Sequence, residues 1–346
     1  MTTFSAHPHT PSDVGPSAFS ASAQSSGHPD SLSLSGDEPF FIVHNVGSGR
    51  SATDEVQATI KRILDEGQRR YEIFTVHDPK ELTQTAEKAL KKAQSERGVV
   101  VAAGGDGTLN AVARVVLGQG VPFAILPQGT FNYFGRTYGI SQDTEASTRC
   151  LLDAKIEPVQ VGMLNGLAFL VNASLGLYPT LLEDREAFKQ KYGRSRWVAL
   201  WSGLVTLFRN HRQLTLALEV EGANKRIRTP TLVVGNNALQ LEQIGIEQTD
   251  ALAHGELVAM GAKPVGTLSL YKLLALGLFS HLGEAENVFS FGFKNMVVNP
   301  LGSRRVKVAM DGEITHIQSP LKFSVAEHRL PLLVPREEAV REQARA

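Results

Sequence analysis

The first third of the chain alternates short apolar runs with longer amphipathic segments. Small and β-branched residues fill the run from Gly98 to Ala103, which predicts a buried strand. The segment that follows it, Leu109 to Leu117, places apolar residues at helical spacing. The other predicted elements of this region are strands at 40–43, 71–76 and 121–126 and helices at 54–67 and 80–94. Strands that alternate with helices are typical of a parallel sheet with helices on both faces.

From about residue 159 the pattern changes to short strand-like runs separated by turns. The stretch Val161–Val171 predicts a hairpin that turns at Asn165–Gly166, because Asn-Gly favours the backbone geometry of a tight hairpin. Further strands are predicted at 214–220, 226–234, 255–259, 295–298, 305–310 and 321–325, and helices at 184–209 and 268–282. This half is therefore predicted to be mainly antiparallel β-structure.

The composition of the chain sets its predicted organisation. Residues 1–38 are rich in Ser, Pro, Ala, Gly and His and hold few large apolar side chains, so they cannot bury enough surface to offset chain entropy. We therefore expect a disordered tail. The predicted domains are this tail (1–38), an α/β domain (39–158), a β-rich domain (159–335) and a C-terminal tail (336–346).

Charge and cysteine content narrow the predicted environment. Lys plus Arg and Asp plus Glu both number 35, so the net charge is zero and a globally basic nucleic-acid binder is disfavoured. The single cysteine, Cys150, cannot form an internal disulfide, which fits a reducing compartment. We see no secretory signal and no apolar run of bilayer length. These features predict a cytoplasmic protein. Peripheral attachment of this protein to the inner face of the membrane is an open alternative.

A glycine turn with one acidic residue, Gly104-Gly-Asp-Gly-Thr108, joins the buried strand at 98–103 to the helix that follows. Polar turns also follow the strands at 40–43 and 121–126, and ligands bind at the carboxyl ends of strands in open α/β sheets. Backbone N–H groups and the positive end of a helix dipole suit a phosphate there. Because a carboxylate repels phosphate, Asp106 predicts an accompanying cation, hydroxyl or proton transfer.

Four short motifs, in this order along the chain, resemble the diacylglycerol-kinase catalytic-domain family, which includes bacterial lipid kinases, sphingosine kinases and ceramide kinases. They are NVGSG at 45–49, GGDGT at 104–108, LPQGTFN at 126–132 and DGE at 311–313. The resemblance covers about residues 40–335. It implies an ATP-dependent kinase that phosphorylates a lipid hydroxyl, diacylglycerol-like or sphingoid. It also implies that the nucleotide lies in the cleft between an N-terminal α/β domain and a C-terminal β-sandwich.

The resemblance further implies a set of site residues. The implied ATP contacts are Asn45, Gly47, Ser48, Gly49, Thr75, Gly104, Gly105, Asp106, Gly107, Thr108, Asn110, Thr130 and Asn132. Asp106 would hold Mg²⁺, and the general base would come from Asp311 or Glu313. The residues themselves agree with this chemistry: no P-loop motif is present, and phosphoryl transfer needs positioning, charge neutralisation and a proton acceptor. Thr75 has the weakest basis, because threonine is ordinary in a strand.

Plainer interpretations of the same motifs stay open. Asp106 could be only a helix cap, and Asp311-Gly312 only a hairpin turn, although a turn and a base are compatible roles. The chain also departs from the family pattern, because Tyr133 follows Asn132 where an Asp is common. Asp250 is the one carboxylate in the stretch 250–255, where some bacterial relatives bind a structural Mg²⁺, so we expect no such site.

A basic stretch at 187–212 has two open interpretations. It carries lysines and arginines but no acidic residue, with Trp197 and Trp201 among apolar residues at helical spacing. Such a helix suits an anionic membrane surface, or its apolar face packs on the β-rich domain. Two other functions stay open, a kinase of a soluble acceptor such as a nucleotide or sugar and a non-catalytic nucleotide- or lipid-binding regulator. A homodimer is kept as a candidate assembly.

Overall fold

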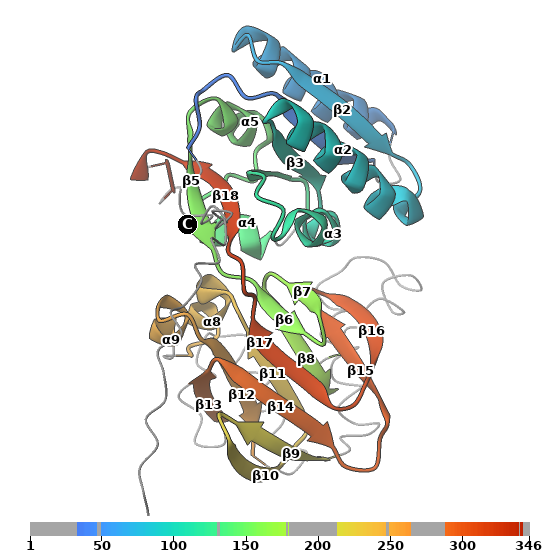
Figure 1. Ribbon diagram of the computed structural model, residues 1–346, viewed down its shortest axis with the longest axis vertical. Helices are drawn as coiled ribbons and strands as arrows, with labels where there is room; N and C mark the ends of the chain where they lie inside the picture. Colours follow the sequence, from blue (N-terminus) through green and yellow to red (C-terminus); the bar gives the residue numbers. More distant parts are fainter. Residues whose placement is uncertain are drawn as a thin grey trace, which may run out of the picture.

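The computed structural model describes residues 33–46, 50–129, 132–177, 179, 213–246, 249–263, 288–338 and 340–341. Within these residues lie three six-stranded sheets. One sheet and its helices form the upper body in Figure 1, and the other two sheets form the lower body. This arrangement confirms the predicted α/β domain joined to a mainly antiparallel β-sandwich.

The upper sheet is parallel except at one edge. Its strand order is β2 (Tyr71–Val76), β1 (Phe40–Asn45), β3 (Val99–Gly104), β4 (Phe123–Pro127), β18 (Leu330–Pro335) and β5 (Ala154–Val159). The pairs from β2 to β18 run parallel, and β5 runs antiparallel to β18. Parallel alignment brings the carboxyl ends of β1, β3 and β4 to one edge of the sheet.

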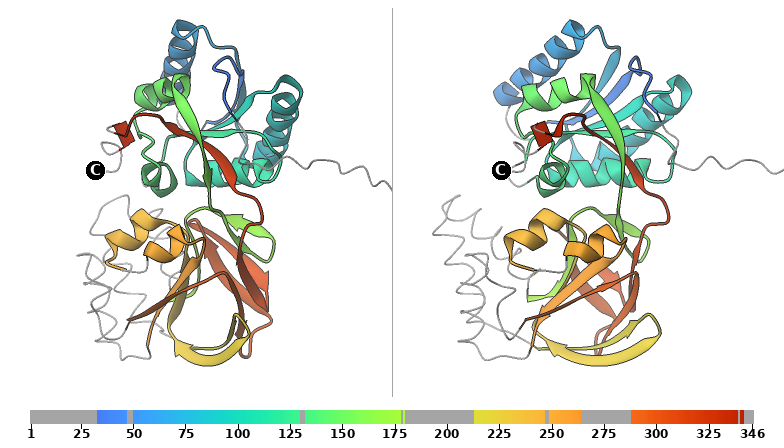
Figure 2. Two further views of the ribbon diagram at one scale, coloured as in Figure 1. Left: turned by 60° about the vertical axis from the view of Figure 1, so that its left-hand side comes forward. Right: turned by 90° about the vertical axis from the view of Figure 1, so that its left-hand side faces the viewer.

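Helices cover both faces of this sheet. Every residue of β3 and nearly every residue of β1 is buried, because successive side chains point to opposite, equally covered faces. One face packs against α2 (Leu82–Glu96) and α3 (Asp106–Val116). The other packs against α1 (Arg50–Glu66) and α5 (Thr144–Leu152). Figure 2 shows the helices on the two sides of the sheet.

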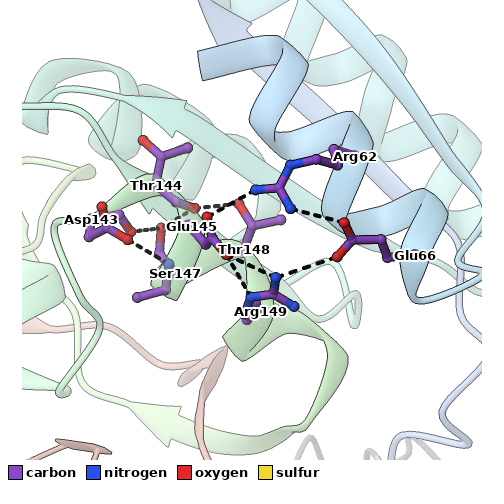
Figure 3. Close-up of polar contacts among 9 residues, drawn as sticks. Arg62, Glu66, Asp143, Thr144, Glu145, Ser147, Thr148 and Arg149 are labelled. Carbon is purple, nitrogen blue, oxygen red and sulfur yellow. Dashed lines mark hydrogen bonds and ion pairs between the residues drawn. The ribbon is translucent and has the colours of Figure 1, made fainter. Parts of the chain in front are cut away.

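Four charged side chains join α1 to α5 at the surface (Figure 3). Arg62 lies 2.9 Å from Glu66 on its own helix and 2.9 Å from Glu145 on α5. Arg149 bonds Glu145 at 2.8 Å and reaches back to Glu66 at 3.4 Å. All four side chains are about half exposed. Exposed ion pairs contribute roughly 0–1 kcal/mol each, so this network orients α5 more than it stabilises the domain.

The lower body is a sandwich of two antiparallel sheets around one apolar core. The first has the order β10 (Ala223–Thr229), β9 (Leu214–Val220), β14 (Asn295–Pro300), β17 (Leu321–Val325), β6 (Gly162–Leu164) and β7 (Leu167–Phe169). The second has the order β13 (Val288–Phe293), β12 (Leu257–Ala262), β11 (Thr231–Gly235), β8 (Asn172–Gly176), β15 (Arg305–Met310) and β16 (Glu313–Gln318). The predicted hairpin is present as β6–β7, with Asn165 and Gly166 at φ 48° and 82°.

Two features of the topology differ from the sequence prediction. The single strand predicted at 226–234 is interrupted at Pro230, which lacks a backbone N–H, and its halves β10 and β11 lie in different sheets. The last strand of the predicted β-rich segment 159–335 returns to the first sheet as β18. All six residues of β18 are buried, which fits a sheet covered on both faces. The chain therefore crosses between the domains twice, before β6 and before β18.

Short elements complete the described structure. They are the 3₁₀ helix at Pro79–Glu81, α4 (Tyr133–Thr137), α8 (Ala238–Gln243) and α9 (Thr249–Ala253). Helices α4 and α8 contact each other between the two bodies. The predicted helices at 184–209 and 268–282, and nearly all of the predicted tail at 1–38, lie outside the described residues. No helix among the described residues combines the length and apolarity that crossing a bilayer requires.

Candidate active site

The glycine turn at 104–108 forms the start of helix α3. Strand β3 ends at Gly104, and the carbonyl of Gly105 accepts from the backbone N–H groups of Thr108 and Leu109 at 2.9 and 3.1 Å. A Cβ on Gly104 would lie 2.7 Å from the side chain of Thr108, so the turn requires glycine there. The first N–H groups of a helix have no partner within it. The turn therefore presents N–H donors and the positive helix end at the edge of the sheet.

The turn after β4 packs against this first turn. The N–H of Gln128 donates to the carbonyl of Gly104 at 2.8 Å, and a Cβ on Gly129 would lie 3.2 Å from the Cα of Gly105. Asn132 is fully buried at φ 44°, and its side-chain amide donates to the carbonyl of Gly129 at 2.7 Å. The two turns thus form one surface. Thr130 lies outside the described residues.

The first polar turn is joined to the same surface through Asn45. This residue ends β1, and its side-chain amide donates to the hydroxyl of Thr108 at 2.8 Å. Thr108 is 4% exposed, so the contact is held inside the edge of the sheet. The predicted contacts Gly47, Ser48 and Gly49 lie outside the described residues. Thr75 lies one strand further out, exposed at the end of β2.

Asp106 carries a buried carboxylate oxygen without a partner. Its Oδ1 has no hydrogen-bond donor among the described residues, and the same is true of the buried Oδ1 of Asn132. Burial raises the pKa of Asp106 above its ordinary value, and the backbone N–H of Asn132 opposes that rise. A buried, unpaired oxygen is costly and calls for an explanation. Oxygen atoms of this kind are the ligands that Mg²⁺ prefers, so each of the two fits a hard cation.

These two residues supply only part of a metal coordination shell. Among the described residues, no group of three or more His, Cys, Asp or Glu side chains could hold a metal ion. Mg²⁺ commonly binds through one or two carboxylates, with substrate phosphates and waters completing its shell. Asp106 at the start of α3 matches that pattern, because the same turn presents donors for phosphate.

The second domain contributes the turn between β15 and β16. The Oδ2 of Asp311 accepts from the side-chain amide of Asn110 at 2.6 Å and from the N–H of Leu170 at 2.7 Å. Its Oδ1 accepts from the N–H groups of Val171 and Asn172 at 2.8 and 3.0 Å. Burial raises the pKa of Asp311 to about 6, against the opposing effect of these backbone donors. With both oxygens engaged, Asp311 joins helix α3 to the second domain.

Glu313 begins β16 and reaches the glycine turn. A Cβ on Gly107 would lie 2.5 Å from the Oε1 of Glu313, so the carboxylate rests directly against the start of α3. Glu313 is exposed, whereas Asp311 is committed to four donors. The geometry therefore favours Glu313 over Asp311 as the candidate base. Asn110, an implied nucleotide contact, instead directs its amide to Asp311.

Sequence reasoning missed residues that bond across the join between the two bodies or fix the crossing segment after β5 to the second domain. Arg114 of α3 donates through Nε to the carbonyl of Ala168 on β7 at 2.9 Å. Asn236 and Gln160 are both buried and bond each other at 2.9 Å, and the amide of Asn236 also donates to the carbonyl of Leu170 at 3.1 Å. No motif marks these residues. Single Arg, Asn and Gln residues acquire this role only when the fold brings their partners within reach.

Tyr133, the departure from the family pattern, begins α4. Its half-buried side chain packs against the apolar core of the first domain, and its carbonyl accepts from the amide of Asn237 at 3.3 Å. Asn237 is the N-cap of α8, so this contact links α4 to the second domain. The position therefore contributes packing and an interdomain contact, and the oxygens that fit a cation come from Asp106 and Asn132.

Comparisons with known proteins agree with this geometry. Residues 39–164 match the family model described as the diacylglycerol kinase catalytic domain. The chain is 25% identical over 202 residues to a probable YegS-like lipid kinase of Cronobacter sakazakii, covering 56% of the chain and 64% of that protein. It is 32% identical over 142 residues to a probable YegS-like lipid kinase of Pseudomonas aeruginosa, covering 40% and 44%. The matched regions thus span less than two thirds of these curated relatives.

A solved structure shows the same fold over nearly its whole length. It is the crystal structure of a putative diacylglycerol kinase from Bacillus anthracis, with 20% identity and a TM-score of 0.68. The match covers 88% of this chain and 98% of that one. The chain thus shares its two-domain fold with that protein, and its first domain resembles the catalytic domain of lipid kinases. Residues 39–164, which hold three of the four motifs, match the diacylglycerol kinase catalytic-domain family that the motifs resemble, and this match confirms the resemblance.

Proposed function

We propose that this protein is an ATP-dependent kinase that transfers the γ-phosphate to the hydroxyl of a lipid. The observation that carries the proposal is the contact between Glu313 and Gly107. It brings a proton acceptor from one domain against the anion-binding start of a helix in the other. Phosphoryl transfer needs these two functions side by side. The family match supports the lipid as acceptor.

The nucleotide side of the site is built from the first domain. The start of α3 offers backbone donors to the phosphates, and the bond from Asn45 to Thr108 fixes this turn relative to β1. Asp106 and Asn132 would hold Mg²⁺ through their unpaired oxygens. When bound, the cation offsets phosphate charge, which relieves the repulsion between Asp106 and the nucleotide. Glycines at the turn keep side chains out of the path of the phosphates.

The acceptor side is built from the second domain. Glu313 takes the proton of the lipid hydroxyl as the oxygen attacks the γ-phosphorus. The bond from that phosphorus to the β–γ bridging oxygen breaks, and ADP leaves with the electron pair. Asp311 does not touch the reacting atoms in this scheme. It is a positioning residue that holds the β15–β16 turn, and with it Glu313, against α3.

Replacing Gly107 with alanine tests the contact that carries the proposal. The new Cβ would lie 2.5 Å from the Oε1 of Glu313, so the flexible carboxylate must move away. Alanine is favoured over glycine in a helix by about 1 kcal/mol, so stability should be unchanged or slightly raised. We expect turnover to fall at least about tenfold, in the range typical of a displaced general base. Unchanged turnover in Gly107→Ala would place the base elsewhere.

The acceptor class is tested with γ-labelled ATP, Mg²⁺ and a crude lipid extract. Label in the organic phase supports the proposed lipid kinase. Label in a water-soluble product would instead support a kinase of a soluble acceptor, and no transfer with intact nucleotide binding would support a non-catalytic regulator. Purified diacylglycerol and a sphingoid base, tested separately, then distinguish the two lipid classes. The Glu313→Gln protein is the matched control, because it keeps the fold and lacks the proposed base.

A further inference from the structure

A cavity of about 590 Å³ opens between the two sheets of the sandwich. It lies between β10 and β13, which are the edge strands of their respective sheets. Strand β10 lies at the end of the sandwich away from the α/β domain, whereas α3 lies on the side of that domain that faces the sandwich (Figure 1). Glu313 lies against the start of α3. The volume is within the range of about 300–1,000 Å³ that is usual for small-molecule sites. The cavity is therefore separate from the candidate active site.

The interior of this cavity is apolar. Leu218 and Val220 of β9 and Ile227 of β10 form one side, and Phe289 and Phe291 of β13 form the other. The two phenylalanine rings are stacked with their centroids 6.4 Å apart. Ile227, Phe289 and Phe291 are only partly buried although they pack on the sandwich core. An apolar chain that enters between the edge strands would remove this surface from water.

The mouth of the cavity is cationic. Lys225, Arg228 and Lys263 line it, all three are exposed, and no carboxylate belongs to its described lining. Lys225 lies two residues before Ile227, so it shares the cavity-facing side of β10 with that apolar residue. An apolar interior with a cationic mouth is complementary to a molecule with an acyl chain and an anionic head group. A neutral lipid would not use the three cations.

These lysine and arginine side chains also have a simpler interpretation. Charged residues on an edge strand, including those that point inward, prevent a sheet from pairing with another molecule. That role needs no cavity, and it gives no reason for the charged residues of the described lining to have one sign. The two interpretations differ in what they predict for residues beside the cavity. Arg226 is on the same strand but is not part of the lining, so it serves as an internal control.

We propose that this cavity binds an anionic phospholipid of a bilayer, with one acyl chain between β10 and β13 and the head group at Lys225, Arg228 and Lys263. The site would hold the protein on an anionic membrane surface while the active site works on a separate lipid. Because the binding needs neither ATP nor Glu313, it stands apart from the proposed phosphotransfer. A failure of one proposal therefore leaves the other intact.

Vesicle sedimentation of the full chain tests the proposal without nucleotide. The vesicles contain either phosphatidylcholine alone or phosphatidylcholine with about one phosphatidylglycerol in five lipids. We expect binding only to the anionic vesicles. Each basic residue at a membrane surface contributes about 1 kcal/mol, so the triple variant Lys225→Gln, Arg228→Gln, Lys263→Gln should bind on the order of 100-fold more weakly. The control triple Arg226→Gln, Lys294→Gln, Lys322→Gln removes the same charge from exposed positions outside the cavity.

A second variant tests the acyl chain. Ala223 is exposed and lines the cavity, so Ala223→Trp should fill its opening without disturbing the core. We expect this variant to retain its melting temperature. When anionic vesicles are added, the backbone amides of Phe289 and Phe291 should gain protection from hydrogen exchange in wild type but not in this variant. Equal loss of binding in the two triple variants would overturn the proposal in favour of non-specific charge attraction. Absence of wild-type binding to anionic vesicles, or binding only to free fatty acid in solution, would also overturn it.

Discussion

The Glu313→Gln protein should bind ATP within a few-fold of wild type and turn over about 10²–10⁴ times more slowly. That is the usual loss when a general base is removed, and glutamine cannot accept the proton of the acceptor hydroxyl. The proposed nucleotide contacts lie in the first domain and are unchanged by the substitution. The measurement is single-turnover transfer of labelled phosphate to lipid, with ATP binding measured separately by titration.

The Asp311→Asn protein provides the contrast. An asparagine can offer one oxygen, so its amide nitrogen would face donors that now bond the carboxylate, at Asn110 or at 170–172. Leaving a buried donor unsatisfied costs about 1–3 kcal/mol, so the melting temperature should fall and turnover should fall with it. Glu313→Gln should keep its melting temperature, because Glu313 is exposed. If Glu313→Gln is fully active, our choice of base is wrong.

The Asp106→Asn protein should lose Mg-ATP binding and about 10²–10³ in turnover, the scale of removing one electrostatic stabiliser from an active site. Binding of metal-free nucleotide should be unchanged or tighter, because a repulsive charge has gone from the start of α3. The two outcomes are measured by nucleotide titration with and without Mg²⁺. A loss of Mg-ATP binding without any loss of metal-free nucleotide binding identifies a cation-holding role.

A plain capping role for Asp106 predicts a different result. Asparagine caps helices about as well as aspartate, so activity, stability and Mg²⁺ dependence would all survive. In the structure Gly105 is the N-cap of α3 and Asp106 is the first helical residue. The matched control is Asp143→Asn, because Asp143 does cap its helix by accepting from the N–H of Ala146 at 2.8 Å. Asp143→Asn should leave nucleotide binding unchanged with and without Mg²⁺.

Several elements of both domains follow from local pattern. Strand β3 is apolar at every position because both faces of its sheet are covered, and such a run is visible without any knowledge of its neighbours. Strands β2, β9, β15 and β17 begin and end at the predicted residues. The turn at Asn165–Gly166 is equally local, because two positive φ angles are required there and the sequence supplies suitable residues.

The local sequence pattern does not determine which sheet a strand joins or which strands it pairs with. No strand was predicted at 330–335, and nothing in this buried apolar run says that it pairs with β4 and β5 rather than with the sandwich. The same holds for β10 and β11, which are close in sequence and belong to different sheets. Long-range packing determines which strands pair. The residues of a strand show only which side chains share a face, through their two-residue period.

The sequence by itself determined which residues carry the candidate chemistry, because the motifs are local patterns. They are the glycine turns, the acidic residue within one of these turns, and the acidic pair late in the chain. Only the tertiary structure separated the roles of that pair. Asp311 and Glu313 are two residues apart, yet one carboxylate is enclosed by donors from two domains and the other lies against Gly107. Burial and hydrogen-bond partners decide what a carboxylate does, and both come from residues distant in sequence.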